Sequence, residues 1–358
     1  MRYDSRIYIN KREISINSPT YFIADIASNH DGDLSRAKSL IWQAKEAGAD
    51  AVKFQHFRAD RIVSDYGFKN LGGQGSHQAS WKKTVYEVYK QYECNREWNE
   101  ELANTAKEAV IDFMTTPYDV EAVTMLDSYI PAYKIGSGDI TWTDFIKMVA
   151  KHGKPVLLAT GASTMDDVER AVDAVLEYNR QIVLLQCNTN YTGSLENFCY
   201  INLRVLQTYA IQFPNMLLGL SDHTSGHATV LGAIALGARV VEKHFTDDNS
   251  RQGPDHTFSM NPNSWREMIE CSRELELALG DGVKRVEQNE MDTVIIQQRC
   301  LRLVRDMQDG EKLELSDLEV LRPAPKGSLK PCRLNEAIGK TLAVFKVAGD
   351  ALYESDLR

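Results

Sequence analysis

Eight short strand-like segments alternate with amphipathic helical segments from residue 21 onward, and this regular alternation limits the fold more than any other feature. Most of the predicted strands are apolar on both faces, as expected for strands that are covered on both sides. They span residues 21–27, 50–55, 111–116, 132–137, 155–160, 181–187, 216–221 and 239–244. Eight βα units close a parallel barrel, so the pattern predicts an α/β fold, a (β/α)8 TIM barrel.

The helical segments carry their own start and stop signals. In residues 33–48, Asp33 is the expected N-cap and Gly48 the expected stop, and Ser163-Thr164 followed by Asp166-Asp167 resembles a capping box. The other helices are expected at 96–109, 119–128, 141–152, 164–178, 198–212, 225–236 and 262–279. An open doubly wound sheet is the alternative fold, but it usually has fewer strands, and no Gly-rich nucleotide loop follows the first strand.

Two parts of the chain depart from this alternation. Residues 57–94 are too long for a plain βα connection; their glycine-rich stretch 72–75 is expected to be mobile, and residues 81–92 to form a short aromatic helix. This segment is interpreted either as a lid or as an ordered surface embellishment. Near Gly280 the pattern changes, which predicts a barrel domain over 1–285, a charged linker over 286–297 and a small, mostly β domain over 298–358.

Composition excludes several classes of protein. The net charge of −9 argues against a nucleic-acid partner, because phosphate binding needs clustered Lys and Arg. The longest apolar run, Val230 to Ala238, is too short to cross a bilayer, and the charged first residues show no secretory signal. The six cysteines form no CxxC pair, which favours reduced thiols and a cytoplasmic protein without membrane partners.

Two lysines stand in otherwise apolar strands, close to the carboxyl ends where barrel enzymes keep their catalytic groups. Burying Lys53 and Lys134 is costly unless an anion pairs with each of them. A neighbouring Asp or Glu would explain one such lysine. Two of them, together with the hydroxyl groups of Thr116, Ser137 and Ser221, favour a phosphate or carboxylate ligand.

His223 and His244 end consecutive predicted strands, so a barrel of this type places them side by side at roughly 5 Å by backbone spacing. Two imidazoles with open coordination positions suit a borderline divalent metal such as Mn²⁺, Zn²⁺ or Fe²⁺, although a single histidine is more often structural. His77 and His152 are interpreted as surface or loop residues. His256 stays undecided, and His227 is expected in the helix that follows His223.

Eight motifs in this order resemble the sialic acid synthase family, which condenses phosphoenolpyruvate with an N-acylated amino sugar to give a nonulosonic acid. They are IADIASNHDGD, AGADAVKFQ, TTPYD, AYKIGSGD, LLATGAS, GLSDHTSG, VEKHFTDD and GPDH. The tail, with VLRPAPKGSLKP, is similar to the antifreeze-like domain that ends those enzymes. The resemblance covers the chain from about residue 20 to residue 358.

The resemblance implies a role for each matching residue. His223 and His244 would bind a divalent metal, usually Mn²⁺, with Mg²⁺ or Co²⁺ as alternatives. The residues assigned to catalysis are Asp25, Lys53, Lys134 and Asp139. Besides both lysines, phosphoenolpyruvate would be held by Thr116, Ser137 and Ser221, and by Thr189 or Asn190. The amino sugar would contact Gln55, Tyr191 and Asp255, and Arg322 of a second subunit would reach its N-acyl end, which implies a domain-swapped homodimer.

The chain departs from the family pattern at four positions. Asp25 and Asp139 replace glutamates, which retracts each carboxylate by about 1.5 Å. Ala159 replaces a serine expected on the phosphate, and Thr192 replaces a loop proline. These changes favour a different or bulkier acceptor sugar, or weakened activity.

The leading hypothesis is therefore a metal-dependent synthase of the sialic acid type. A 3-deoxy-octulosonate- or heptulosonate-phosphate synthase is disfavoured, because those enzymes lack the tail domain and need extra positive charge for a phosphorylated acceptor. The third hypothesis is a catalytically weak relative that binds sugars or acts as a regulator. The sequence RQGPDH at residues 251–256 favours an acceptor sugar that leads to a sialic or legionaminic acid over one that leads to a pseudaminic acid.

Overall fold

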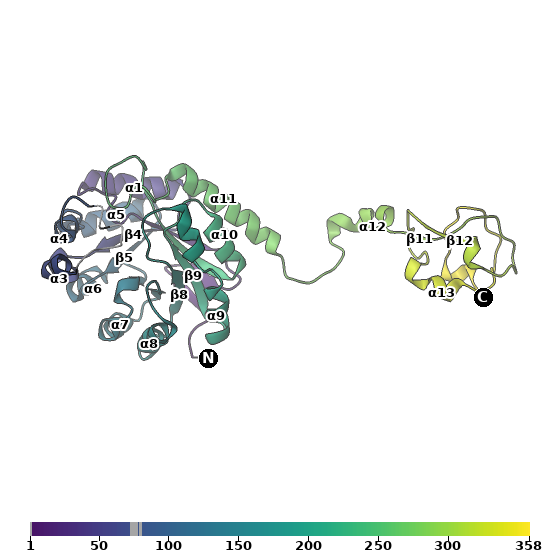
Figure 1. Cartoon of the computed structure of the whole chain (residues 1–358), viewed down its shortest axis with the longest axis horizontal. Coiled ribbons are helices and arrows are strands. Elements are labelled where there is room, and N and C mark those ends of the chain that lie inside the picture. The colour runs from purple at the N-terminus through teal and green to yellow at the C-terminus, as the bar shows by residue number, and fades with distance from the viewer. Residues whose placement is uncertain (1, 72–77, 79–80) are drawn as a thin grey trace. The chain divides into compact units, whose positions relative to one another are not determined.

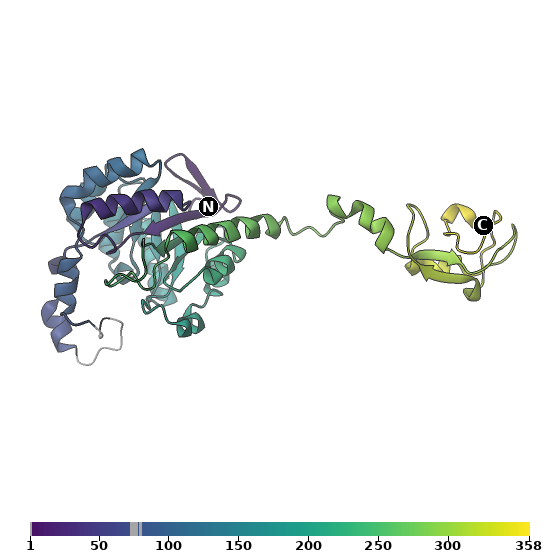
Figure 2. The same ribbon diagram turned by 90° about the horizontal axis from the view of Figure 1, so that it is seen from above.

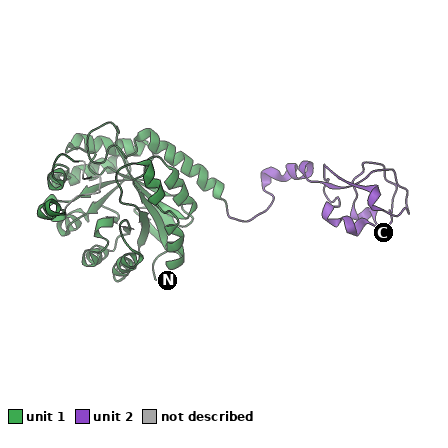
Figure 3. Cartoon of the chain, viewed as in Figure 1, with its two compact units in different colours: residues 1–280 green, residues 281–358 purple. Residues whose placement is uncertain are grey.

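The computed structural model describes residues 2–71, 78 and 81–358. The glycine-rich stretch 72–75 and His77, for which we made predictions above, lie outside these described residues. The chain divides into two compact units, Met1–Gly280 and Asp281–Arg358, which Figure 3 shows in different colours. The two units are described separately below.

The first unit is built around a closed barrel of eight parallel strands (Figure 1). Each strand pairs with the next one along the chain, and the last pairs with the first. The strands are β3 (Tyr21–Asp25), β4 (Ala51–His56), β5 (Asp112–Pro117), β6 (Tyr133–Ile135), β7 (Val156–Ala159), β8 (Ile182–Cys187), β9 (Leu217–Asp222) and β10 (Ala238–His244). The predicted TIM barrel is confirmed, and the alternative of an open sheet is wrong.

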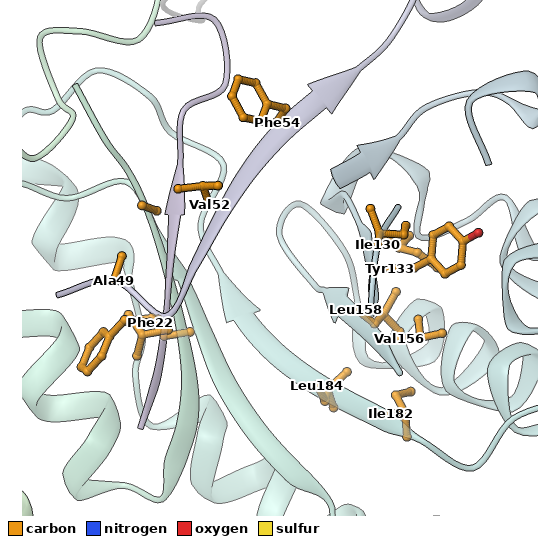
Figure 4. Packing of buried hydrophobic residues seen from close by; sticks show 14 of the residues in the cluster. Phe22, Ala49, Val52, Phe54, Ile130, Tyr133, Val156, Leu158, Ile182 and Leu184 are labelled. Carbon is orange, nitrogen blue, oxygen red and sulfur yellow. The ribbon is translucent and has the colours of Figure 1, made fainter. Parts of the chain in front are cut away.

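Eight α-helices follow the eight strands and surround the barrel. They are α1 (Leu34–Glu46), α5 (Asn99–Glu108), α6 (Val120–Leu126), α7 (Thr143–Ala150), α8 (Met165–Leu176), α9 (Val205–Gln212), α10 (Ala228–Ala235) and α11 (Pro262–Leu279). Alternate strand residues such as Phe22, Val52 and Leu184 point outward into the apolar layer beneath these helices (Figure 4). Their neighbours Tyr21, Ala51 and Val183 belong to a separate cluster that fills the lower barrel.

The cap residues fix where several helices begin. The Asp33 side chain accepts hydrogen bonds from the backbone of Ser35 and Arg36, and Thr164 and Asp167 form a reciprocal capping box, so both predictions are confirmed. The helix predicted over 198–212 is instead broken: a 3₁₀ helix, η4 (Leu195–Tyr200), precedes α9, because Asn202 between them has a φ of 48°.

An antiparallel hairpin, β1 (Arg6–Ile9) and β2 (Arg12–Ser15), precedes the barrel and was not predicted. Its Ile7, Ile9 and Ile14 are fully buried in the cluster that fills the lower barrel. The hairpin therefore covers the amino-terminal end of the barrel strands. The opposite, carboxyl-terminal end is left for the candidate active site.

The long connection after β4 contains α2 (Ala59–Ile62), α3 (Asp65–Asn70), α4 (Val85–Gln91) and the 3₁₀ helix η2 (Arg96–Trp98). Figure 2 shows α3 and α4 projecting from the body of the barrel. The short aromatic helix predicted within residues 81–92 is confirmed as α4, and Thr84 and Glu87 form its capping box. The Glu93 side chain accepts a hydrogen bond of 2.7 Å from the backbone of Ala59, which ties the end of this segment to α2.

The second unit has a small core of its own around Leu301, Met307 and Leu352. Its sheet consists of β11 (Cys300–Leu303) and β12 (Leu318–Leu321), which are antiparallel. The helical elements are η5 (Gln288–Glu290), α12 (Met291–Gln297), η6 (Leu315–Asp317), η7 (Pro331–Arg333), α13 (Leu334–Ala337) and η8 (Glu354–Asp356). Within the described part of the chain, no helix is long and apolar enough to cross a membrane.

Candidate active site

A cavity of about 390 Å³ opens at the carboxyl-terminal end of the barrel. Its floor comes from residues at the ends of the strands, including the last residues of β3, β8 and β10, which are Asp25, Cys187 and His244. Part of its wall comes from Val88 and Tyr89 of α4. The long segment after β4, interpreted above either as a lid or as an ordered surface embellishment, thus contributes residues to the cavity wall.

The structure brings most of the residues selected from the sequence together in this cavity. Its lining includes Asp25, Lys53, Gln55, Thr116, Lys134, Ser137, Asp139, Tyr191, Ser221, His223, His244 and Asp255. Three selected residues do not line it, namely Thr189, Asn190 and Arg322. Arg322 is exposed in the second unit, and the other two lie in the loop after β8.

That loop is shaped by its own contacts. Asn190 accepts hydrogen bonds from the backbone and hydroxyl of Thr192 and from the side chain of Asn197, so its amide oxygen is already engaged. Thr189 packs its methyl group beside Gly161, where even a Cβ atom would come within 2.5 Å of it. Neither residue is among those that line the cavity, and their proposed contact with phosphoenolpyruvate stays a prediction.

Lys53 is fully buried and paired. Its Nζ lies 2.8 Å from Oδ2 of Asp25 and donates a hydrogen bond of 2.9 Å to the hydroxyl oxygen of Thr116. Gln55 donates to the same oxygen of Asp25 at 2.9 Å. Burial alone would raise the pKa of Asp25, but Lys53, His244 and these hydrogen bonds together hold that pKa below its usual value.

Lys134 is paired with a carboxylate that sequence analysis missed. Its Nζ lies 3.3 Å from Oε1 of Glu242, which also accepts a hydrogen bond from Ser221 and lies 4.0 Å from Nζ of Lys53. The other oxygen of Glu242 is buried without a hydrogen-bond partner among the described residues. The sequence could have identified Glu242, because it stands two residues before His244 on the same strand and its side chain therefore lies on the same face.

Asp139 is the second carboxylate near Lys134. It lies on the 3₁₀ helix η3 (Ser137–Asp139), and its Oδ2 is buried with no hydrogen-bond partner in the described structure. Burial raises the pKa of Asp139 to about 6, although Lys134 acts in the opposite direction. A carboxyl group with this pKa can both accept and release a proton near neutral pH.

The two selected histidines are neighbours at the mouth of the strands. The centroids of the His223 and His244 rings are 5.3 Å apart. Nδ1 of His223 lies 2.8 Å from the backbone carbonyl of Asn188, which orients the ring with Nδ1 as the donor. The ring also has a side-chain hydrogen bond with the thiol of Cys187. Nε2 of His244 lies 3.8 Å from Asp25, and its Nδ1 is buried without a partner in the described residues.

This donor set fits a divalent metal that takes few ligands from the protein. No group of three or more His, Cys, Asp or Glu side chains with metal-binding geometry occurs within residues 2–71, 78 and 81–358. Two imidazoles, one of them oriented by a backbone carbonyl, leave coordination positions for substrate oxygens and water. Phe258 and Tyr191 pack against the two rings and limit their movement.

The other described histidines, which are His30, His56, His152, His227 and His256, do not line the cavity. His227 immediately precedes α10 rather than lying inside it, because Gly226 has a φ of 68° and the helix begins only at Ala228. The buried ring of His256 is held between Thr246 and Asp31. Nδ1 of His152 is 3.1 Å from Asp127, and His152 lies in the connection between α7 and β7, before that strand begins.

The outer wall of the cavity is aromatic, and sequence analysis did not select it. Phe57, Trp81, Tyr89 and Tyr92 line it, and the rings of Phe57 and Tyr89 are 5.2 Å apart. Asp255 lies at this wall and accepts a hydrogen bond of 2.5 Å from the hydroxyl of Ser28. Aromatic faces beside a single carboxylate suit the apolar face and the polar groups of a sugar.

The comparisons with known proteins agree with this geometry. Residues 40–284 match the model of the NeuB family, and residues 298–358 match the SAF domain. An N,N'-diacetyllegionaminic acid synthase of Legionella pneumophila is 35% identical over 338 residues, which are 93% of this chain and 93% of that protein. The human N-acetylneuraminate-9-phosphate synthase is 32% identical, over 94% of this chain and 92% of that protein.

A solved structure shows the same fold. The N-acetylneuraminic acid synthetase of Leptospira borgpetersenii serovar Hardjo-bovis, in complex with citrate, superposes with a TM-score of 0.70 and is 27% identical. The match covers 82% of this chain and 96% of that one. The chain belongs to the NeuB family of nonulosonic acid synthases, metal-dependent enzymes that condense phosphoenolpyruvate, and it carries a C-terminal SAF, or antifreeze-like, domain.

Proposed function

We propose that this protein condenses phosphoenolpyruvate with an unphosphorylated N-acylated amino sugar of the N-acetylmannosamine type to give a nonulosonic acid and phosphate. One observation carries the proposal: two buried lysines and a pair of histidines line the same cavity at the strand ends. The lysines suit an anion and the histidines suit a cation, which are the two charges that this reaction needs together.

Phosphoenolpyruvate would occupy the inner end of the cavity. Lys53 and Lys134 provide two positive charges there, and Thr116, Ser137 and Ser221 provide hydroxyl groups beside them. In the described structure these lysines are engaged by Asp25 and Glu242, so the anion would compete with the protein's own carboxylates. Charge-assisted hydrogen bonds to phosphate and carboxylate oxygens would offset this competition.

The charge balance supports a requirement for a metal. The described lining has four carboxyl groups, on Asp25, Asp139, Glu242 and Asp255, but only two ammonium groups. A trianionic substrate would be repelled by this excess of negative charge. His223, through Nε2, and His244 would hold a divalent cation, with Mn²⁺ as the first choice and Mg²⁺ or Co²⁺ as alternatives, and this ion would polarise the aldehyde oxygen of the open-chain sugar.

The reaction joins C3 of phosphoenolpyruvate to the aldehyde carbon of the sugar. Water then adds its hydroxyl group to C2, and its other proton goes to the former aldehyde oxygen. Phosphate leaves by cleavage of its bond to C2 and takes the proton of the added hydroxyl group, so that C2 becomes the keto carbon. The Oδ2 atom of Asp139 is buried and unpartnered in the described structure, and we assign it the transfer of the proton from this water. Asp25 keeps Lys53 and Gln55 in place between the two substrates.

The sugar would lie between this inner site and the outer wall. Gln55, Tyr191 and Asp255 line that part of the cavity beside the aromatic residues of the long segment. We further propose that Arg322 from a second copy of the chain completes the site at the N-acyl group, as in a domain-swapped homodimer. The exposed position of Arg322 in the second unit is compatible with such a contact.

A substrate panel tests the function. Phosphate release would be measured with phosphoenolpyruvate and each of N-acetylmannosamine, its 6-phosphate, diacetamido deoxyhexoses, arabinose 5-phosphate and erythrose 4-phosphate, with Mn²⁺ and with a chelator. We expect Mn²⁺-dependent release with at least one unphosphorylated N-acyl sugar and a nine-carbon 2-keto acid in the product. Turnover only with phosphorylated sugars, or with none of the sugars, would contradict the proposal.

A further inference from the structure

A buried ion pair lies directly behind the two histidines, on the face of the strands that points away from the cavity. Asp222 is the last residue of β9, and Lys243 is the neighbour of His244 on β10. The two are paired in register and are about 2% and 1% exposed. Their sequence neighbours Ser221, His223, Glu242 and His244 line the cavity, so Asp222 and Lys243 point toward the helix layer.

Asp222 is the centre of a dense set of hydrogen bonds. One of its oxygens accepts from the backbone of Thr224 at 3.2 Å. The other accepts from the hydroxyl of Thr224 at 2.9 Å, from the hydroxyl of Thr229 at 2.7 Å, and from Lys243. Lys243 also donates a hydrogen bond of 2.7 Å to the backbone carbonyl of Thr224. The turn at 222–224 is thereby attached to β10 and to the first turn of α10.

His223 depends on this attachment because it lies beyond the end of the strand ladder. The last paired residues of β9 and β10 are Asp222 and Lys243, so no ladder pairing fixes His223 relative to His244. Beyond the ladder pair of Asp222 with Lys243, the turn is joined to β10 by the side chain of Lys243, through its contacts with Asp222 and the carbonyl of Thr224. On its other side, the His223 ring is held by the carbonyl of Asn188.

Stability alone gives little reason for a charged pair at this position. A buried ion pair has to be desolvated, and a well-packed apolar pair of similar volume is often as stabilising or more so. Charged and hydrogen-bonded groups instead impose one geometry, because every donor and acceptor must be satisfied at once. We infer that Asp222 and Lys243 are positioning residues that set the separation of the His223 and His244 imidazoles for metal binding.

The inference rests on the proposed metal site, so its test measures metal binding directly. The dissociation constant for Mn²⁺ would be determined by electron paramagnetic resonance of free Mn²⁺ in the absence of substrates. The main variant is the double substitution Asp222→Asn with Lys243→Met, which leaves no unpaired buried charge. Thr229→Val is a milder second variant that removes a single hydrogen bond to Asp222.

Asp50→Asn is the matched control. Asp50 pairs with Arg12 at the opposite end of the barrel, and the substitution disrupts this pair without touching the turn at 222–224. We expect the double variant to raise the dissociation constant for Mn²⁺ at least tenfold and Thr229→Val to raise it severalfold. Asp50→Asn should leave the dissociation constant for Mn²⁺ within twofold of the wild-type value, even if its melting temperature falls as much as that of the double variant.

A second readout separates positioning from general damage. With Mn²⁺ raised to saturation, kcat of the double variant should recover to within severalfold of the wild type, and KM for phosphoenolpyruvate should stay within about twofold. An unchanged Mn²⁺ affinity in both turn variants, or an equal loss of affinity in Asp50→Asn, would overturn the inference. Failure of the wild type to bind Mn²⁺ would overturn the metal site itself, which is a different outcome.

Discussion

Nζ of Lys134 lies 3.3 Å from Oε1 of Glu242, while Oε2 of that glutamate is buried with no hydrogen-bond partner in the described part of the chain. The anion that pairs with the lysine is therefore a carboxylate of the protein itself. A ligand that uses Lys134 has to replace this contact, which makes Glu242 a competitor for the same charge. The same relationship holds between Lys53 and Asp25, at 2.8 Å.

Replacing Glu242 by Gln tests this competition. The amide keeps a hydrogen-bonding group near Ser221 but removes the negative charge, so we expect the dissociation constant for phosphoenolpyruvate to fall by about 3- to 10-fold. Binding would be measured by calorimetry with Mn²⁺ and without an acceptor sugar. Weaker binding in this variant would mean that Glu242 orders the lysines and does not compete with the substrate.

Replacing Lys53 by Met tests the buried pair at the centre of the site. It leaves Asp25 without its ammonium partner, and removal of one partner of a buried ion pair typically costs about 3–5 kcal/mol. The free energy of unfolding from urea titration should fall by that amount. The double variant Asp25→Asn with Lys53→Met should recover much of the loss.

Lys38→Met is the control for this experiment. Lys38 pairs with Glu101 at the surface, where both side chains are substantially exposed, and such pairs contribute about 0–1 kcal/mol. A loss in the Lys53 variant no larger than in this control would show that the Asp25–Lys53 pair contributes nothing to stability.

Replacing Asp139 by Asn tests its raised pKa. In the folded state the pKa is about 6, above the reference value of 3.8, so the folded protein binds the proton more tightly than the unfolded chain does. The resulting stabilisation is present below pH 3.8 and is lost as pH rises to about 6. Asparagine has no charge to bury, so the variant should gain up to about 3 kcal/mol relative to the wild type between pH 4 and pH 7.

The gain would be measured from unfolding curves across this pH range. Asp144→Asn, at the exposed start of α7, serves as the matched control, and its stability relative to the wild type should not follow this trend. A stability difference for Asp139→Asn that does not change with pH would contradict the buried, unpartnered state of this carboxyl group. We expect the kcat of the wild type to decrease below pH 6, where Asp139, the proposed proton acceptor, is protonated. This decrease should be absent in the Asp139→Asn variant.

Replacing Arg322 by Ala tests the proposed contact from a second subunit. Steady-state kinetics should show KM for the amino sugar rising about tenfold or more, with KM for phosphoenolpyruvate changed less than twofold, because charge-assisted hydrogen bonds contribute about 1.5–3 kcal/mol. Arg333→Ala is the control, since Arg333 lies in the same unit but pairs with Glu336 and Glu354. Equal effects on both substrates would argue against the contact.

Particular residues show what the sequence could and could not predict. The barrel followed from hydrophobic patterning, and the unusual residue types at strand ends identified both lysines and both histidines. Glu242 was missed because residues were selected by type and not by the alternation that places it on the same face as His244. Two features could not be predicted from local patterns, because they depend on contacts with other segments. They are the burial of Ile7, Ile9 and Ile14 under the barrel and the loop conformation around Asn190.

The central claim is that phosphoenolpyruvate loses its phosphate by C–O cleavage when its C3 joins the sugar. Phosphoenolpyruvate labelled with ¹⁸O at the oxygen that bridges carbon and phosphorus measures this directly, by mass spectrometry of the phosphate released with Mn²⁺ and an accepted N-acyl sugar. The account predicts that the released phosphate retains the bridging label and appears in equal amount with the nonulosonic acid. Unlabelled phosphate, or phosphate released without the sugar, would contradict it.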